Sequence, residues 1–190
     1  MSYSPAVIAS PVIARSRALS AALVVTVTAL TAVAAQWYIP LWPVPVTGQT
    51  LVILLGGAAL GWRAGAAAQV LYLAVGALGV PVFTEASSGI DVLWGPAATT
   101  SGYLFAFPVA AALVGWLAER RHDRKFWTMA AAFVAGSAVI YLGGMMGLIA
   151  VLGIGVSEAF SAGVWPFLIG DAIKAAAAGV LLPGAWKLLR

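Results

Sequence analysis

The stretch WTMAAAFVAGSAVIYLGGMMGLIAVLGI, residues 127–154, decides the fold of this chain. It holds no charged residue, and a helix needs roughly 20 such apolar residues to cross a hydrocarbon core about 30 Å thick. A membrane-spanning strand would alternate polar and apolar residues, and this run is unbroken. We therefore expect a membrane-spanning helix, because in lipid every backbone polar group must be satisfied within the protein.

The rest of the sequence has the same character. Its 190 residues are 63% hydrophobic and 8% charged, whereas soluble domains average roughly 45–50% and 25%. We expect a single all-α membrane domain over residues 1–190, a polytopic bundle of about six transmembrane helices with no separate soluble domain. The expected spans are residues 17–36, 49–62, 64–80, 99–118, 127–154 and 163–187.

The first span shares some features with a cleavable signal peptide. Its apolar run, residues 18–35, follows Arg15 and Arg17 and ends in Val33-Ala34-Ala35. The apolar core of a signal peptide is usually about 7–15 residues long. Because this run is longer, we expect it to remain in the protein as a span.

Charge sets the orientation of these spans. Short cytoplasmic loops carry an excess of lysine and arginine, and here nearly all such residues fall on one side of the map. They are Arg15, Arg17, Arg63, the cluster Arg120–Lys125, Lys187 and Arg190. The opposite loops carry only acidic charges, at Glu85, Asp91 and Glu158. We therefore expect both termini inside, and we interpret the net charge of +4 as topology, not nucleic-acid binding.

Asp171 and Lys174 lie inside the last expected span, where ionisable residues are costly and therefore functional candidates. Their spacing puts them on one helical face. A helix beginning near Val164 would place Asp171 about 10 Å below the outer surface, in a pocket open to the outside. A carboxylate beside an ammonium suits an uncharged amide-like or ureido group. The alternative is an ion pair that only fixes helix packing.

Outer segments supply further candidates for this pocket. Thr47 and Gln49, in a proline-stiffened segment, can donate and accept hydrogen bonds, although the segment is equally typical of a rigid turn. The loop at 83–89 is long enough to fold down as a lid. Tyr103 and Tyr141 are ligand contacts, packed side chains or interface anchors, since aromatic residues commonly gather at membrane interfaces.

Small residues stand four apart on three of the expected spans, a spacing that permits close helix approach. They serve either packing within the bundle or docking of another membrane subunit. The pairs are Ala18 with Ala22, Gly57 with Gly61, and Gly143 with Gly147.

Catalytic motifs are missing from the sequence. It has no phosphate-binding Gly-x-x-x-x-Gly-Lys-[Ser/Thr] loop and no Gly-x-Ser-x-Gly elbow. Without cysteine, disulfides and thiolate chemistry are excluded. The lone His122 lies in a basic loop, which leaves no histidine-based metal site within the membrane. We expect neither an enzyme nor a metal site.

Several segments, in this order and at this spacing, resemble the BioY family, the biotin-specific S-components of energy-coupling factor (ECF) transporters. The similarity covers nearly the whole length. Its most specific segments are Pro43-Val44-Pro45-Val46-Thr47-Gly48-Gln49-Thr50, Leu78-Gly79-Val80-Pro81-Val82-Phe83, Gly95-Pro96, Ser101-Gly102-Tyr103 and Pro166-Phe167-Leu168-Ile169-Gly170-Asp171-Ala172-Ile173-Lys174.

The resemblance implies that Asp171 and Lys174 contact biotin near its ureido ring. It also implies a contact from the loop after the third span, carried over here to Ser87, although Glu85 and its neighbours depart from the glycine-rich pattern of the family. Where the family has Gly-Gly-Tyr, this chain has Ser101-Gly102-Tyr103.

The resemblance further implies a place and partners for the chain. These are the plasma membrane of a bacterium, a membrane-embedded coupling subunit docked on the small residues of the first span, and two cytoplasmic ATPases, with no cofactor besides the transported biotin. Some members occur without those partners, so a self-sufficient transporter or channel is the alternative function. A purely structural membrane subunit is a further one.

Overall fold

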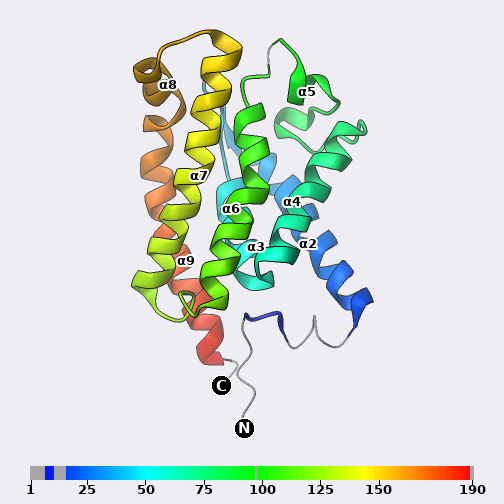
Figure 1. Cartoon of the computed structure of the whole chain (residues 1–190), viewed down its shortest axis with the longest axis vertical. Helices are drawn as coiled ribbons and strands as arrows, with labels where there is room; N and C mark the ends of the chain where they lie inside the picture. Colours follow the sequence, from blue (N-terminus) through cyan, green and yellow to red (C-terminus); the bar gives the residue numbers. More distant parts are fainter. Residues whose placement is uncertain (1–6, 11–15, 97, 189–190) are drawn as a thin grey trace.

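The computed structural model describes residues 7–10, 16–96 and 98–188. Long helices run along the length of the molecule, with shorter segments gathered at one end (Figure 1). The helices are α2 (Arg17–Ala35), α3 (Gln49–Leu60), α4 (Trp62–Ala77), α5 (Asp91–Trp94), α6 (Ser101–Glu119), α7 (Phe126–Leu152), α8 (Val156–Gly163) and α9 (Leu168–Leu188). Two 3₁₀ turns, Thr84–Ala86 and Trp165–Phe167, and two short strands, β1 (Tyr38–Ile39) and β2 (Val46–Thr47), complete the described elements.

Local sequence explains where these helices begin and end. The Ser16 hydroxyl accepts a hydrogen bond from the backbone of Ala18 and caps α2. Gly61 separates α3 from α4 at a φ of 86°, and Gly153 ends α7 at a φ of 66°. Both angles lie in the left-handed region that side chains with a Cβ avoid. The chain therefore changes direction sharply at these two glycines, between α3 and α4 and after α7.

The six expected apolar runs all form helices, with ends within three residues of the expected bounds except at the start of the last run. In the described part of the chain, however, four helical segments are long and apolar enough to span a membrane: α2, α6, α7 and the stretch from α8 through α9. α3 has 12 residues and α4 has 16. A mostly helical fold with apolar helices of membrane-spanning length is confirmed, whereas six crossings stay a prediction. Two charges used for the orientation, Arg15 and Arg190, lie outside the described residues.

The last helix begins later than the sequence suggested. Residues Val156–Gly163 form a helix of their own, and a 3₁₀ turn containing Pro166 separates it from α9, which starts at Leu168. The expectation of a helix from Val164 was therefore wrong. Proline favours the first turn of a helix and interrupts one that precedes it. Asp171 consequently lies in the first turn of α9, only about 5 Å along its axis.

Close helix packing decides the role of most small residues. A Cβ added to Gly102 of α6 would lie 2.2 Å from the carbonyl oxygen of Gly143 and 2.9 Å from the Cα of Gly147, both on α7. A Cβ on Gly57 would similarly meet the Ala111 oxygen at 2.4 Å. These glycines therefore serve contacts inside the bundle. Ala18 and Ala22, by contrast, are exposed on α2.

A buried carboxylate joins the α6–α7 loop to the end of α9. Asp123 is fully buried; it accepts a hydrogen bond from the Trp186 indole and lies 3.2 Å from Nε of Arg124. The Arg124 guanidinium also covers the Trp186 ring at 3.3 Å. Burial raises the pKa of Asp123, against the opposing effects of Trp186 and Arg124.

Asp123→Ala is expected to destabilise the protein by about 1–3 kcal/mol, because it leaves the buried Trp186 indole N–H without its acceptor. Thermal unfolding in detergent measures this effect, with His122→Ala in the same loop as the control. A variant as stable as the control would show that the buried contact contributes nothing.

Candidate functional site

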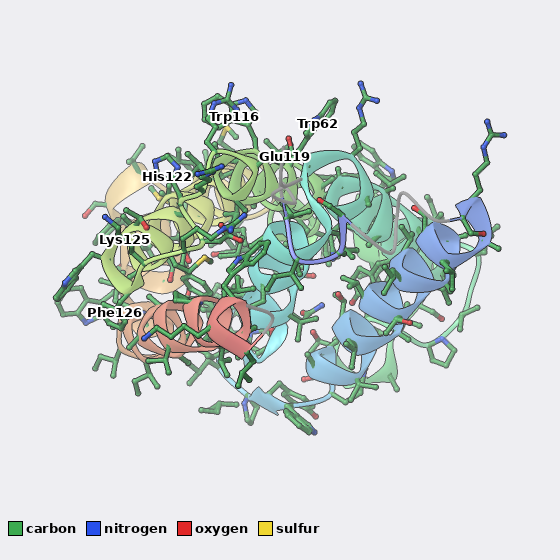
Figure 2. All side chains as sticks on the ribbon, turned by 90° about the horizontal axis from the view of Figure 1, so that it is seen from below. Trp62, Trp116, Glu119, His122, Lys125 and Phe126 are labelled. Atoms are coloured by element: carbon green, nitrogen blue, oxygen red, sulfur yellow. The ribbon has the colours of Figure 1, made fainter. Side chains whose placement is uncertain are left out.

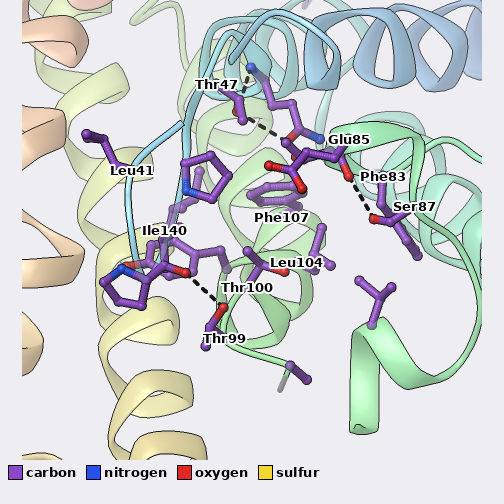
Figure 3. Close-up of a pocket in the computed structure, with 18 of the residues that line it drawn as sticks. Leu41, Thr47, Phe83, Glu85, Ser87, Thr99, Thr100, Leu104, Phe107 and Ile140 are labelled. Atoms are coloured by element: carbon purple, nitrogen blue, oxygen red, sulfur yellow. Dashed lines mark hydrogen bonds between the residues drawn. The ribbon is translucent and has the colours of Figure 1, made fainter. Parts of the chain in front are cut away.

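A cavity of about 510 Å³ lies at the end of the bundle that holds α5 and the β1–β2 hairpin. Its lining comes from the hairpin and start of α3, the 83–96 segment, the first turns of α6, and the middle of α7. Figure 3 shows Thr47, Phe107, Leu104 and Ile140 around this space. Glu85 and Ser87 of the 83–89 loop lie on the side away from Ile140. The cavity is therefore assembled from segments that are far apart in the sequence.

The walls of the cavity are mostly apolar. Well-buried side chains from four different elements face it, and Phe167 also packs against the rings of Tyr103 and Tyr141, with centroids 6.0 and 6.2 Å apart. These apolar lining residues are Phe83, Leu104, Phe107, Ile140 and Phe167. An apolar cavity with a few placed polar groups is the usual site of a small organic ligand.

One edge of the cavity is polar and belongs to the start of α3. Gln49 is only 3% exposed; its side-chain oxygen accepts from the Thr47 hydroxyl at 3.2 Å, and its amide nitrogen donates to the Tyr72 hydroxyl at 2.9 Å. Tyr72 in turn donates to the Val82 carbonyl at 3.0 Å. This chain of hydrogen bonds fixes the polar edge against α4 and the base of the 83–96 segment.

Asp171 and Lys174 meet directly behind this edge. The Lys174 ammonium donates to Asp171 Oδ1 at 2.8 Å, to the Thr50 hydroxyl at 2.7 Å and to the Thr47 carbonyl at 2.9 Å. Asp171 is 6% exposed, and its carboxylate also accepts from Thr50 at 3.0 Å and from Tyr141 at 2.6 Å. The two charges thus neutralise each other, and hydrogen bonds with Thr47, Thr50 and Tyr141 stabilise them further.

The cavity lining includes Thr47, Thr50 and Tyr141 but neither Asp171 nor Lys174. The expected direct contact of this pair with a ligand stays a prediction. What the geometry supports is that the pair holds the hydroxyls of Thr50 and Tyr141, both of which reach the cavity, in fixed positions. Of the other expected site residues, Gln49, Ser87 and Tyr103 also line the cavity.

The loop at 83–89 covers one side of the cavity in an unusual backbone conformation. Glu85 and Ala86 have φ angles of 61° and 52°, values that are uncommon for residues other than glycine. The Gln36 side chain at the end of α2 holds this loop, since it donates to the Phe83 carbonyl at 2.9 Å and accepts from the Ala86 N–H at 3.1 Å. Ser87 donates to Thr84 within the loop at 2.7 Å.

Tyr103 has two kinds of contact in the structure, and its expected contact with a ligand stays a prediction. Its ring lines the cavity, while its hydroxyl donates to the Gly163 carbonyl at 2.7 Å and so joins α6 to the end of α8. Thr50 and Gln36 were not among the expected site residues. A signal existed for Thr50, which ends the quoted segment Pro43–Thr50. No sequence signal identified Gln36, because its side chain contacts Phe83, which is 47 residues further along the chain.

Among the described residues, no cluster of three histidine, aspartate or glutamate side chains could hold a metal ion. The arrangement can bind a ligand by hydrogen bonds and apolar contact. It holds hydroxyl and amide groups at one edge and hydrocarbon and aromatic groups on the walls.

Comparison with known proteins gives a consistent picture. The model of the BioY family matches residues 9–190. The probable biotin transporter BioY of Pyrococcus horikoshii is 38% identical over 165 residues, which are 87% of this chain and 94% of that protein. The biotin transporter BioY of Thermotoga maritima is 38% identical over 154 residues, 81% and 88% of the two chains.

A solved structure shares the fold. The crystal structure of the S-component for biotin from an ECF-type ABC transporter superposes with a TM-score of 0.80, covering 90% of this chain and 92% of that chain at 22% sequence identity. The helical arrangement seen here is therefore that of an S-component.

Proposed function

Because the chain belongs to the BioY family, we propose that it is the S-component of an ECF transporter and binds biotin from the outer side of the membrane. The observation that carries this proposal is the cavity of about 510 Å³, with apolar walls and a single polar edge. The family is one of transporter components, so the chain is not an enzyme.

The chemistry of biotin suits this cavity. Its ureido group carries two N–H donors. The hydroxyls of Thr47, Thr50 and Tyr141 at the polar edge each donate their one proton within the protein, so their oxygens are available to accept from such donors. The rest of the bicyclic ring and the aliphatic chain would lie against the apolar walls. In this proposal Asp171 and Lys174 determine ureido binding, either by contact or through Thr50 and Tyr141, to which they are hydrogen-bonded.

The proposal includes an orientation in the membrane. We place the chain as one multi-pass domain over residues 1–190 in the bacterial plasma membrane, crossing about six times, with both termini inside. Three features that lie at the same end of the bundle support this orientation: the start of α2, the end of α9 and the basic α6–α7 loop (Figure 1). The cavity is at the other end and would then open outward.

The proposed partners are a membrane-embedded coupling subunit and two cytoplasmic ATPases, and no cofactor is needed in this chain. Support for a docking face comes from α2, whose small residues Ala18 and Ala22 are exposed along with Val25. Exposed small residues four apart allow another helix to approach closely. The glycine pairs elsewhere are occupied by contacts inside the bundle.

Calorimetric titration of the purified chain with biotin tests the proposal. We expect saturable one-to-one binding without ATP, and no binding of an apolar analogue in which the ureido ring is replaced. A well-folded sample that ignores biotin would refute the proposal. Biotin uptake into liposomes that contain this chain alone would instead favour a self-sufficient transporter.

A further inference from the structure

A second concave surface lies on the outside of the bundle, at the end opposite the biotin cavity. It is a groove of about 370 Å³ between the start of α4 and the second half of α6. Its lining residues are Trp62, Val109, Ala112, Leu113 and Trp116. Figure 2, seen from this end, places Trp62 and Trp116 near each other at one edge of the bundle, with Glu119 beside them.

Each tryptophan of the groove carries an arginine on its ring. The Arg63 guanidinium lies 4.9 Å from the Trp62 ring centroid, and that of Arg120 lies 3.6 Å from the Trp116 ring. Arg120 also donates from Nη1 to the Trp116 carbonyl at 3.5 Å, and the remaining N–H donors of the stacked guanidinium groups can bind an anion. Two cations therefore lie beside the groove, one on each of its tryptophans.

Neither arginine forms an ion pair among the residues that the structure describes, where ion pairs join Arg124 to Asp123 and Lys174 to Asp171. The adjacent Glu119 accepts a hydrogen bond at Oε1 from the Trp62 backbone at 3.1 Å, which caps the start of α4. Counted with this carboxylate, the two arginines leave a surplus of one positive charge beside the groove.

The apolar part of the groove runs away from the arginines into the membrane. From Trp116 to Val109 is seven positions, or about 10 Å along α6. Val109 is 59% exposed, and both tryptophans are 42% exposed. Tryptophan side chains favour the boundary between headgroups and hydrocarbon, so Val109 lies at the depth of acyl chains. A soluble anion could use only the arginines, whereas a lipid could occupy the whole groove.

We propose that this groove binds one anionic phospholipid, with its phosphate between Arg63 and Arg120 and an acyl chain along Val109, Ala112 and Leu113. The phosphate has the charge and the oxygen acceptors that two guanidinium groups complement. The apolar floor supplies the contact that a free phosphate would lack. This site is separate from the biotin cavity and shares no lining residue with it.

The experiment is native mass spectrometry of the full chain in detergent, titrated with phosphatidylglycerol or with phosphatidylcholine of the same acyl chains. We expect phosphatidylglycerol to bind on the order of tenfold more tightly, since each arginine near a membrane surface favours anionic lipid severalfold. Arg63→Gln with Arg120→Gln should remove this preference. Ala112→Phe should weaken binding of phosphatidylglycerol while leaving both arginines in place.

The matched control is Arg121→Gln with Lys125→Gln, which removes the same charge at the same end but outside the groove. Both control residues are exposed, and Figure 2 shows Lys125 away from the two tryptophans. Equal binding of the two lipids, or an equal loss in the control, would overturn the proposal. So would binding of soluble glycerol phosphate as strong as that of the lipid. Thermal unfolding of each variant verifies that it is folded.

Discussion

Thr100→Trp is expected to weaken biotin binding about a hundredfold, a loss equivalent to roughly 2.7 kcal/mol. Thr100 lines the cavity at the start of α6, and its side chain makes no capping hydrogen bond there. An indole at this position would fill space that the ligand needs, and the close-packed walls cannot move aside without cost. Calorimetric titration measures the change.

Val134→Trp is the control for this substitution. Val134 lies in α7 and is 60% exposed, so the added indole would face lipid without entering the cavity. We expect it to bind biotin as the unmodified chain does. Undiminished binding by Thr100→Trp would place the ligand somewhere other than this cavity.

The second large effect is expected for Asp171→Asn, which should weaken biotin binding at least about tenfold. Thr50 and Tyr141 donate to different oxygens of the carboxylate, and asparagine keeps only one acceptor oxygen, so one of these two hydrogen bonds is lost. The substitution also leaves the Lys174 ammonium without its counter-charge. Lys174→Ala should have a similar effect, because it leaves the carboxylate uncompensated.

Two measurements on Asp171→Asn separate ligand binding from packing. If the ion pair only fixes α9 against α3, the variant will unfold at a lower temperature while its folded fraction binds biotin with unchanged affinity, and the site assignment fails. Glu158→Gln provides the matched control, since it neutralises a carboxylate in α8 that is exposed and contacts only its own helix.

Apolar run length located the long helices but not α5, α8 or the start of α9. Residues 127–154 became α7, Phe126–Leu152, and residues 17–36 became α2, Arg17–Ala35. Hydropathy indicates that a helix is kept from water. This is true both of a helix buried inside the bundle and of a helix that faces lipid. It therefore could not tell whether the shorter α3, packed against α2, α4 and α6, crosses the membrane by itself.

The site was predicted in part, and what was missed depends on tertiary contacts. Spacing correctly brought Asp171 and Lys174 together, because a helix fixes residues three apart. Their position behind Thr50 depends on how α9 meets α3, which no local pattern encodes. Arg63 and Arg120 were interpreted from the sequence only as topology signals, and Trp62 and Trp116 were not considered, although Trp62 and Arg63 are adjacent.

The side chain of Gln36 joins the end of α2 to the 83–87 backbone by two hydrogen bonds. α2 is also the helix whose outer face is proposed to meet the coupling subunit. If docking of the proposed partner changes biotin affinity through this link, biotin changes the affinity for that partner by the same factor. In the proposed complex, the Gln36 amide is therefore the contact through which vitamin capture and subunit assembly would be coupled.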